Sequence, residues 1–307
     1  MNKREDSMTK SVFVAITGRA NTGKSSLTNL LVGEKIAIVS EKPQTTRTRI
    51  NGVLTKGETQ FVFIDTPGMH KAQTKLSEQM VKSIRNSIDD VDVAILMVDC
   101  TKKMSQIEQE LIEGFRQRKL DAILLLNKVD LIKDKTALLK IIQEYSSLYD
   151  FAEIVPISVK NRTNTDAILT AIEKYAKESP HYFRDDLPTD QPEKIWLGEI
   201  VREKILRTMY EEVPHGTAVV VESLEFNKTN KGEPIVDIGL VIICEKQSHK
   251  GMIIGKNGAM LKKIGSIARA EMEDYFESKV NMKLWVKVKE DWRNRESAIA
   301  DLGLSAE

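Results

Sequence analysis

The chain has 307 residues, about twice the length of a typical domain of roughly 150 residues, so two domains are expected. Hydrophobic residues make up 41% and charged residues 30%, which is ordinary for a soluble globular protein and excludes a largely disordered chain. The formal net charge of +1 excludes a global positive field that would attract polyanions. Any nucleic-acid site must therefore be a local cluster of basic residues.

The two cysteines follow apolar runs and have no partner at metal-ligand spacing. We expect Cys100 and Cys244 to be small core or strand-end residues in a reducing compartment. The opening segment MNKREDSMTK is polar, and no run reaches the roughly 18 apolar residues of a membrane span. The sequence therefore predicts a cytoplasmic protein.

From residue 12 to about residue 176, short apolar runs alternate with longer amphipathic stretches. This rhythm predicts an α/β fold in which helices cover a mostly parallel sheet. Ligands of such sheets bind beyond the carboxyl ends of the strands, so the residues that follow each run are candidates for function. The predicted strands are Val12–Ile16, Phe61–Ile64, Val93–Val98, Ala122–Leu126 and Ile154–Ile157, and the predicted helices are Ser26–Val32, Ser105–Gln117, Ala137–Leu148 and Asn164–Tyr175.

A segment rich in proline and charge over residues 180–192 predicts an interdomain linker. It separates an N-terminal domain over residues 1–179 from a smaller α+β pattern over residues 193–307. No internal repeat is evident. The elements predicted after the linker are a helix Glu193–Tyr210, strands Ala218–Glu225, Ile235–Cys244 and Lys283–Val288, and a helix Met260–Phe276.

The sequence GRANTGKS from Gly18 to Ser25 fits the phosphate-loop pattern GxxxxGK[ST] and lies between a predicted strand and a predicted helix. Glycines let backbone N–H groups point at phosphates, and the helix N-terminus adds its positive end. Lys24 would reach the β- and γ-phosphates, and Ser25 would supply a hydroxyl to Mg²⁺. The predicted nucleotide contacts of this loop are Gly18, Arg19, Ala20, Asn21, Thr22, Gly23, Lys24, Ser25 and Ser26.

A DxxG sequence, Asp65-Thr66-Pro67-Gly68, follows the strand Phe61–Ile64. It places a carboxylate where Asp65 can hold Mg²⁺ through water, and a glycine N–H that can meet the γ-phosphate. The polar segment 43–47 lies between this motif and the phosphate loop and suits a mobile switch. Thr46 is the candidate for the hydroxyl that joins Mg²⁺, with Thr45 as the alternative. Lys24, Thr46, Asp65 and Gly68 are the predicted catalytic residues, and Ser25, Thr46 and Asp65 the predicted metal ligands.

The sequence NKVD, from Asn127 to Asp130, closes the strand Ala122–Leu126 and indicates which base is bound. A carboxylate at Asp130 can accept from both the ring N–H and the exocyclic amine of guanine, and adenine lacks this pair of donors. A buried Asp130 would then be left unsatisfied by ATP, so GTP is predicted. Asn127 and Lys128 complete this motif. Ser158, Val159 and Lys160 follow the next strand, where a backbone N–H could contact the guanine oxygen.

Met69 directly follows the DxxG glycine, where Ras-like GTPases have a Gln that orients the attacking water. A Met side chain cannot do this, so we expect slow intrinsic hydrolysis, with the water positioned by backbone, by a partner or by a cation. Asn21 resembles the Asn that helps to bind K⁺ in related GTPases. Stimulation by K⁺ is therefore a hypothesis.

A GxxG turn from Gly255 to Gly258 precedes the helix Met260–Phe276, and two glycines allow a nucleic-acid backbone to approach closely. Residues 246–269 contain six basic residues and no acid, which makes this region the expected local patch. Trp285 and Trp292 are expected to be buried anchors rather than stacking platforms. The predicted RNA contacts are Lys250, Ile253, Ile254, Gly255, Lys256, Asn257, Gly258, Lys262 and Lys263, with Leu261 on the apolar side of the groove.

With both sets of motifs in this order, the chain resembles the Era family of bacterial ribosome-assembly GTPases from about Val12 to Leu304. The resemblance implies a P-loop GTPase domain followed by a type II KH domain that binds the 3′ region of small-subunit ribosomal RNA during maturation of the small ribosomal subunit. It departs from the family pattern at Ala20, Met69 and Val159. The most specific matches are GRANTGKSSL, QTTR, DTPGMHK, NKVD, PTDQP, EIVREKIL, EVPH, HKGMIIGKNGAMLKKIG and LWVKVKEDWR.

Two other functions stay open at this point. One is an RNA-binding assembly factor that binds GTP but gains little from hydrolysing it. The other is a GTPase whose basic surface binds lipid, since the resemblance also implies peripheral association with the inner face of the cell membrane. We expect a monomer that requires Mg²⁺.

Overall fold

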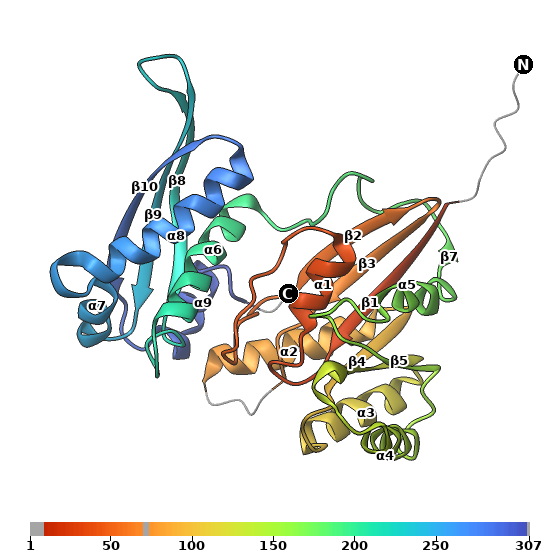
Figure 1. The fold of residues 1–307 in the computed structure, drawn as a ribbon. Helices are drawn as coiled ribbons and strands as arrows, with labels where there is room; N and C mark the ends of the chain where they lie inside the picture. Colours follow the sequence, from red (N-terminus) through yellow and green to blue (C-terminus); the bar gives the residue numbers. More distant parts are fainter. Residues whose placement is uncertain (1–8, 70–73, 306–307) are drawn as a thin grey trace, which may run out of the picture.

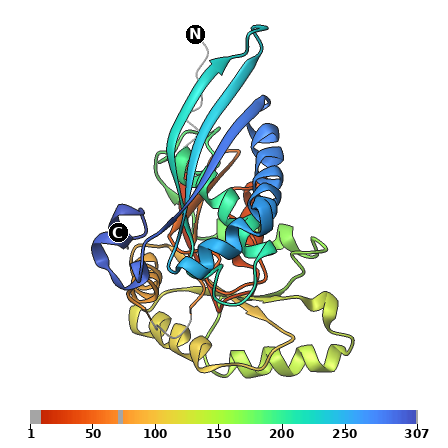
Figure 2. The same cartoon turned by 90° about the vertical axis from the view of Figure 1, so that its left-hand side faces the viewer.

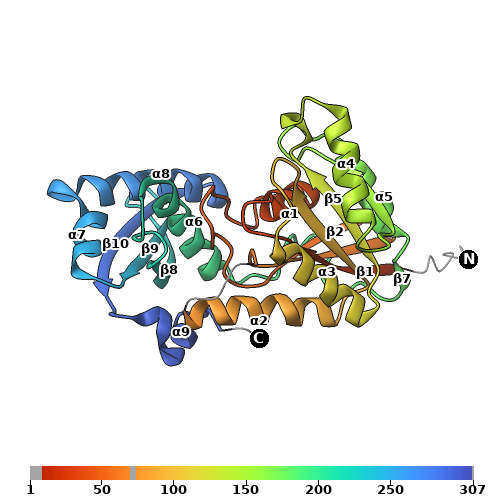
Figure 3. The ribbon, with the colours of Figure 1, turned by 90° about the horizontal axis from the view of Figure 1, so that it is seen from below.

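The computed structural model describes residues 9–69 and 74–305. The first eight residues of the polar opening segment and the last two residues of the DTPGMHK motif lie outside these ranges. The chain forms two units with separate sheets, and the long helix α2 (Lys75–Asp89) reaches from one to the other (Figures 1 and 3). Among the described residues, no helix combines the length and the apolar composition that crossing a bilayer requires.

The N-terminal sheet has the strand order β2-β3-β1-β4-β5-β6, and a short strand β7 pairs with β1. Strands β2 and β7 are antiparallel to their neighbours, and the other pairs are parallel. Every residue of β3, β4 and β5 is buried, as expected for strands covered on both faces. The strands are β1 (Lys10–Thr17), β2 (Ile50–Lys56), β3 (Thr59–Asp65), β4 (Val93–Asp99), β5 (Ala122–Asn127), β6 (Glu153–Pro156) and β7 (Lys177–Glu178).

Two layers of helices bury the faces of this sheet. Helices α1 (Lys24–Val32) and α5 (Thr165–Glu173) share one apolar cluster with β1 and β3. Helices α2, α3 (Gln106–Arg118) and α4 (Lys135–Ser146) pack on the opposite face. The sheet is therefore the middle layer of three, as the alternating pattern predicted.

The register of the parallel strands brings their carboxyl ends to one edge. Ile16 of β1 lies opposite Asp65 of β3, and Asp99 of β4 lies opposite Asn127 of β5. The residues that follow these strands therefore surround a single region, which is where ligands of such sheets bind.

All five strands predicted for this domain are present, with ends shifted by at most two residues, but the sequence patterns missed β2, the short β7 and α2. Strand β2 contains Asn51 and Gly52, residue types that are depleted in strands. Helix α2 is polar on average, although Leu76, Met80, Ile84 and Ile88 recur every four residues on its buried face. Ser77, Ser83 and Ser87 share that face, so it contains few apolar residues.

The predicted linker lies along the edge of the N-terminal sheet. Pro188 O accepts from Val53 N at 2.8 Å, and the Gln60 side chain donates to Phe183 O at 2.9 Å. Gln60 also accepts from the N–H of Tyr182 and of Phe183. These bonds fix the start of the second unit relative to β2, and the domain boundaries at residues 179 and 193 stay a prediction.

The C-terminal unit is an α+β domain built on a three-stranded sheet of order β10-β9-β8. Strand β10 is parallel to β9, and β8 is antiparallel to it. Helices α6 and α8 contribute to one apolar core with this sheet, and the β8–β9 hairpin extends beyond them (Figure 2). The elements are α6 (Glu193–Thr208), β8 (Ala218–Lys228), β9 (Pro234–Cys244), α7 (Gln247–Ile254), α8 (Ala259–Phe276), β10 (Lys279–Val288) and α9 (Glu296–Asp301).

The two tryptophans differ in burial, and the prediction was wrong for one of them. Trp292 is fully buried and its indole N–H donates to Gly216 O at 3.0 Å. Trp285 is 47% exposed, because the odd positions of β10 point away from the helices. Cys100 and Cys244 are both buried, as expected.

Helix α2 connects the two units through its N-terminal end. Leu76 and Met80 pack with Trp292, Ala298 and Ile299 of the C-terminal unit, and Lys75 pairs with Glu296 at 2.7 Å. This end of α2 lies beside α9 (Figure 3). The helix starts at Thr74, whose hydroxyl accepts from Ser77 N in a capping box. Since α2 follows the DxxG motif, this motif is linked to both units.

Candidate nucleotide site and nucleic-acid interface

The predicted phosphate loop joins β1 to α1, as the motif requires. Gly18 and Gly23 have φ values of 145° and 106°, which non-glycine residues rarely adopt. A Cβ atom on Gly18 would lie 2.3 Å from Met97 O, so a side chain there would displace the loop from β4. The loop is therefore shaped by glycines at both ends, with its N–H groups leading into the N-terminus of α1.

The ammonium group of Lys24 lies within this loop. It donates to Gly18 O at 3.1 Å and to Arg19 O at 2.9 Å, and the side chain is buried. Burial lowers the pKa of Lys24 to about 8, although the charge of Asp65 offsets part of the effect. A buried cation of this kind is stabilised by an anion, and a phosphate at the loop would provide one.

The three predicted metal ligands lie together. The hydroxyls of Ser25 and Thr46 are 2.8 Å apart, although the residues are 21 positions apart in the chain. Both carboxylate oxygens of Asp65 are buried and have no hydrogen-bond partner among the described residues. Burial raises the pKa of Asp65 to about 6, and the nearby Ser25 hydroxyl and Lys24 charge offset part of this rise. Two hydroxyls and one unpartnered carboxylate fit Mg²⁺, which prefers oxygen ligands.

Thr45, the alternative to Thr46, is occupied elsewhere. Its hydroxyl bonds to Ser40 and to Lys42 O, each at 2.7 Å. Its carbonyl accepts from Arg202 of the C-terminal unit. The geometry therefore favours Thr46 as the candidate switch hydroxyl.

The DxxG glycine is docked on the phosphate loop. A Cβ on Gly68 would lie 2.7 Å from the Cα of Ala20, and Met69 N donates to Gly18 O at 3.2 Å. The Thr66 hydroxyl donates to Ile16 O at 2.7 Å and fixes the strand end. Pro67 is buried between Thr66 and Gly68. This arrangement holds the Gly68 backbone against Ala20 of the phosphate loop.

The NKVD motif, from Asn127 to Asp130, contacts the backbone of the phosphate loop. Asn127 donates to Thr22 O at 2.7 Å and accepts from Val159 N at 3.1 Å. Lys128 donates to Asn21 O at 3.0 Å and to Asp99 at 2.7 Å. The motif thus links the phosphate loop to the segment after β6 across the carboxyl edge of the sheet.

Asp130 is exposed at this edge of the sheet. The role predicted from the sequence assumed a buried Asp130, so this assumption was wrong. Its Oδ1 accepts from the Ser158 hydroxyl at 2.6 Å, and Ser158 is buried. The N–H groups of Ser158 and Val159 donate to Thr163 O and to the Asn127 side chain, so both already have partners within the protein. Ser158 therefore orients Asp130 without covering it.

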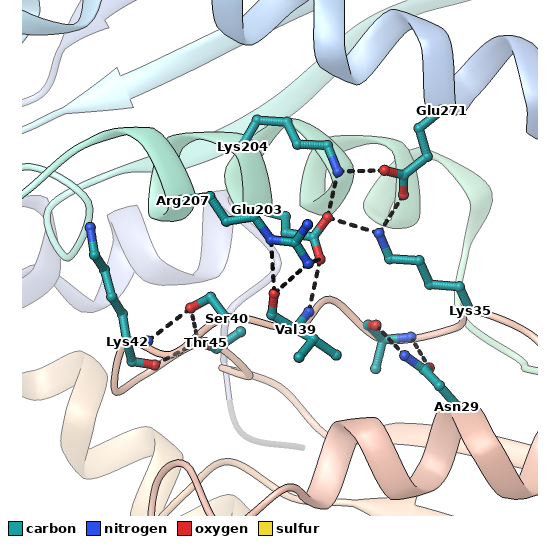
Figure 4. Close-up of polar contacts among 11 residues, drawn as sticks. Asn29, Lys35, Val39, Ser40, Lys42, Thr45, Glu203, Lys204, Arg207 and Glu271 are labelled. Carbon is teal, nitrogen blue, oxygen red and sulfur yellow. Dashed lines mark hydrogen bonds and ion pairs between the residues drawn. The ribbon is translucent and has the colours of Figure 1, made fainter. Parts of the chain in front are cut away.

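Helix α6 of the C-terminal unit contacts the loop between α1 and β2, which contains the switch segment 43–47, and binds the backbone of this loop at Val39 (Figure 4). Glu203 accepts from Val39 N at 3.0 Å, and Arg207 donates back to Val39 O at 3.0 Å. Glu203 also pairs with Lys35 at 2.8 Å and with its neighbour Lys204. Ile38 packs in the core of the C-terminal unit. The segment that carries Thr46 is therefore part of the interface between the units.

Arg47, directly after Thr46, is inserted into the C-terminal unit. Its guanidinium donates to Thr217 O at 2.6 Å and to His215 O at 2.8 Å, and it stacks on Trp292 at 5.7 Å. Burial and the neighbouring charge of Arg202 lower the pKa of Arg47 well below its usual value. Sequence reasoning assigned no role to Arg47 or Glu203, and the only signal was their presence in the matched segments QTTR and EIVREKIL.

Because Glu203 is buried and paired, we expect its substitution to destabilise the protein strongly. Burial alone would raise its pKa, but hydrogen bonds from Lys204 and Lys35 lower it below the usual value. Glu203→Gln is expected to lower the free energy of unfolding by about 3–5 kcal/mol, since it leaves the buried Lys204 with less compensation. Glu222→Gln is the matched control, because the pair of Glu222 with Lys287 is exposed and should contribute less than about 1 kcal/mol.

The stability difference between wild type and Glu203→Gln is expected to depend on pH. A glutamate whose pKa is lowered on folding contributes stability above its unfolded pKa of about 4.3 and loses it as pH falls through the folded pKa. Urea denaturation at neutral pH should therefore separate wild type from Glu203→Gln, and the gap should shrink in acid. Equal midpoints for Glu203→Gln and Glu222→Gln at neutral pH would contradict this role.

The GxxG turn projects from the C-terminal unit between α7 and α8. Gly255 and Gly258 have φ values of 73° and 75°, and a Cβ on Gly255 would lie 2.8 Å from the Cβ of Met260. Lys256 and Asn257 between them are exposed, as are Lys262 and Lys263 on the first turns of α8. Lys250 is partly exposed on α7. The predicted cations therefore surround the turn.

A groove of about 450 Å³ lies beside this turn, and Leu261, Lys262, Arg269 and Leu284 are among the residues that line it. Ile254 is partly exposed. Ile253, also predicted to contact RNA, has a side chain that is fully buried in the core, which gives no support to a direct contact. Two adjacent isoleucines in a helix face different directions, and the sequence did not indicate the short helix α7.

Comparisons with known proteins agree with this arrangement. Residues 13–128 match the family "50S ribosome-binding GTPase", and residues 212–293 match the KH domain family. GTPase Era of Clostridioides difficile (strain 630) is 47% identical over 96% of this chain and 99% of its own length. GTPase Era of Clostridium perfringens (strain ATCC 13124) is 47% identical over 96% and 98%.

Two solved structures cover nearly the whole chain. One is Era in complex with MgGDPNP and nucleotides 1506–1542 of 16S ribosomal RNA, with a TM-score of 0.91 and 35% identity over 97% of this chain and 99% of that one. The other is a variant of Aquifex aeolicus Era bound to GDP and AlF₄⁻, with a TM-score of 0.90 and 35% identity over 96% and 99%. The similarity covers both domains and the segment between them. The chain therefore belongs to the Era family of GTPases.

Proposed function

We propose that this protein is an Mg²⁺-dependent GTPase that binds the 3′ region of small-subunit ribosomal RNA and acts in assembly of the small ribosomal subunit. The observation that carries the proposal is the meeting of Ser25 and Thr46 beside the unpartnered carboxylate of Asp65, in a chain that also presents an exposed GxxG turn. The likeness to Era bound to MgGDPNP and 16S ribosomal RNA supports it.

In this proposal the phosphate loop binds the nucleotide by its backbone N–H groups, and Lys24 exchanges its carbonyl partners for the β- and γ-phosphates. Ser25, Thr46 and Asp65 would hold Mg²⁺, which neutralises phosphate charge when bound. Gly68 would offer its N–H to the γ-phosphate. Asp130, oriented by Ser158, would accept the two guanine donors.

The switch segment would carry the state of the nucleotide to the C-terminal domain. Thr46 faces Ser25, while its neighbours Thr45 and Arg47 contact the C-terminal unit. Any shift of Thr46 therefore changes the domain interface. This contact supports coupling between nucleotide and RNA.

The residues around the GxxG turn would bind single-stranded RNA. Lys256 and Asn257 would contact the backbone, and the groove beside α8 would receive bases, with Leu261 and Leu284 as its apolar lining. A ribosomal RNA partner supports a cytoplasmic location, and we also propose that the protein is a monomer. Lipid binding by the same basic surface is the alternative, and liposome binding that survives nuclease treatment would support it.

Potassium ions are proposed to stimulate hydrolysis. The Asn21 side chain lies at the phosphate loop and donates to Glu41 O, just before the switch segment 43–47. Since Met69 cannot orient water, a cation near Asn21 is one way to complete the site. Single-turnover hydrolysis is expected to be several-fold faster in KCl than in NaCl, and equal rates would reject this role.

The proposed activity is tested by phosphate release from GTP, with and without a fragment of the 16S 3′ end. We expect slow release by the protein, faster release with RNA, and none above background for Lys24→Ala. Release no greater than that of Lys24→Ala under both conditions would instead favour a factor that binds GTP without using its hydrolysis.

A further inference from the structure

The side chain of Arg19 leaves the phosphate loop and contacts helix α3. Its Nε lies 2.9 Å from Oε1 of Glu108, which is fully buried, while the Arg19 side chain is 19% exposed. The two residues are far apart in the sequence, and nothing in the proposed nucleotide contacts requires Glu108. A buried carboxylate is costly unless it is paired, so the pair fixes Arg19 to α3.

Glu108 is itself held in place from two further directions. Its Oε2 accepts from Ser105 N at 2.7 Å and from the Ser105 hydroxyl at 3.1 Å, which forms the capping box of α3. Tyr145 of α4 is buried beside it, and burial followed by the Glu108 charge raises the pKa of the Tyr145 phenol. The carboxylate therefore has little freedom to rotate away from Arg19.

The backbone of Arg19 connects the groups that would surround the γ-phosphate. Its carbonyl accepts from Lys24 at 2.9 Å and from the Thr22 hydroxyl at 3.1 Å. Arg19 also forms an isolated parallel bridge with Met69, next to Gly68. The position of Arg19 thus sets where the phosphate loop meets the DxxG segment.

We propose that Glu108 is a positioning residue for GTP hydrolysis, which it supports by holding Arg19 and so the phosphate loop against the Gly68–Met69 backbone. The inference rests on the proposed GTPase function. Because Met69 cannot orient the attacking water, the reaction depends on backbone placement, and a misplacement of about 1 Å can cost roughly 100-fold in rate. The hydrogen bonds of Lys24 and Ser25 do not involve Glu108, so loss of its carboxylate is expected to leave nucleotide affinity nearly unchanged.

The test is Glu108→Gln, compared with Glu110→Gln, which changes an exposed residue of the same helix. For Glu108→Gln we expect single-turnover hydrolysis roughly 10–100-fold slower and GDP affinity within about threefold of wild type, because the neutral amide keeps the cap but loosens Arg19. Glu110→Gln should match wild type in both its hydrolysis rate and its GDP affinity. Arg19→Met and the double variant complete a cycle in which the double variant is no slower than the slower single one.

Three results would overturn the inference. The first is a hydrolysis rate of Glu108→Gln equal to that of wild type. The second is a loss of GDP affinity in Glu108→Gln as large as its loss of rate. The third is a rate of the double variant that is lowered by the product of the two single losses. If Glu108→Gln does not fold, the double variant, which removes both charges, is compared with Arg19→Met. Equal hydrolysis rates then support the inference, and a further loss of rate in the double variant overturns it. Absence of hydrolysis by the unmodified protein would reject the proposed GTPase function itself, so the two failures are distinguishable.

Discussion

Asp130→Asn is expected to lower GTP affinity by roughly 10²–10⁴-fold and to favour xanthosine triphosphate. Asp130 would accept two hydrogen bonds from guanine, and hydrogen bonds to a charged group contribute about 1.5–3 kcal/mol each. An amide can instead donate to the extra oxygen of xanthine. Competition binding with GTP, xanthosine triphosphate and ATP measures the change.

Asp134→Asn is the matched control for this substitution. Asp134 is an exposed aspartate that caps α4 through Thr136, four residues beyond Asp130. It should leave nucleotide preference unchanged. Retention of the guanine preference by Asp130→Asn would reject the role given to Asp130 and to the Ser158 hydroxyl that orients it.

Replacing Lys256 and Asn257 together by Asp is expected to lower RNA affinity by roughly 10–100-fold at moderate salt. The change adds negative charge at an exposed turn where a phosphate backbone would approach, and one lost cation also reduces the salt dependence of binding. Nucleotide affinity should be nearly unchanged, because the turn lies in the other domain. Filter binding to a fragment of the 16S 3′ end at several salt concentrations measures both effects.

The same pair of residue types occurs in the β8–β9 hairpin as Asn230 and Lys231, also exposed. Changing both of these to Asp makes the identical change in charge away from the GxxG turn. This control should bind RNA nearly as well as wild type. Equal losses in the two double variants would show that overall charge, rather than the turn, controls binding.

Much of the nucleotide site could be predicted because its residues follow buried strands of a parallel sheet. Continuous apolar runs mark such strands, and their register brings Gly18, Asp65 and Asn127 to one edge. The pairing of Ser25 with Thr46 was also expected from their predicted roles. These parts follow from local sequence patterns joined by one general rule of sheet topology.

The rest depends on contacts between distant segments. Arg47 reaches Thr217 across 170 positions, and Glu203 reaches Val39 across 164. A charged residue in a sequence usually lies in solvent, so burial of Glu203 and Glu108 could not be read from their neighbours. The burial of Ile253 depended in the same way on α7, which has only eight residues and weak periodicity.

Retention of guanine nucleotide by the purified protein tests the account most directly. Equilibrium binding of labelled GTP should be tight with Mg²⁺, weaker after chelation of Mg²⁺, and lost in Lys24→Ala, because Ser25, Thr46 and Asp65 are proposed to bind nucleotide and metal together. Failure of the folded protein to bind GTP or GDP in the presence of Mg²⁺ would contradict it.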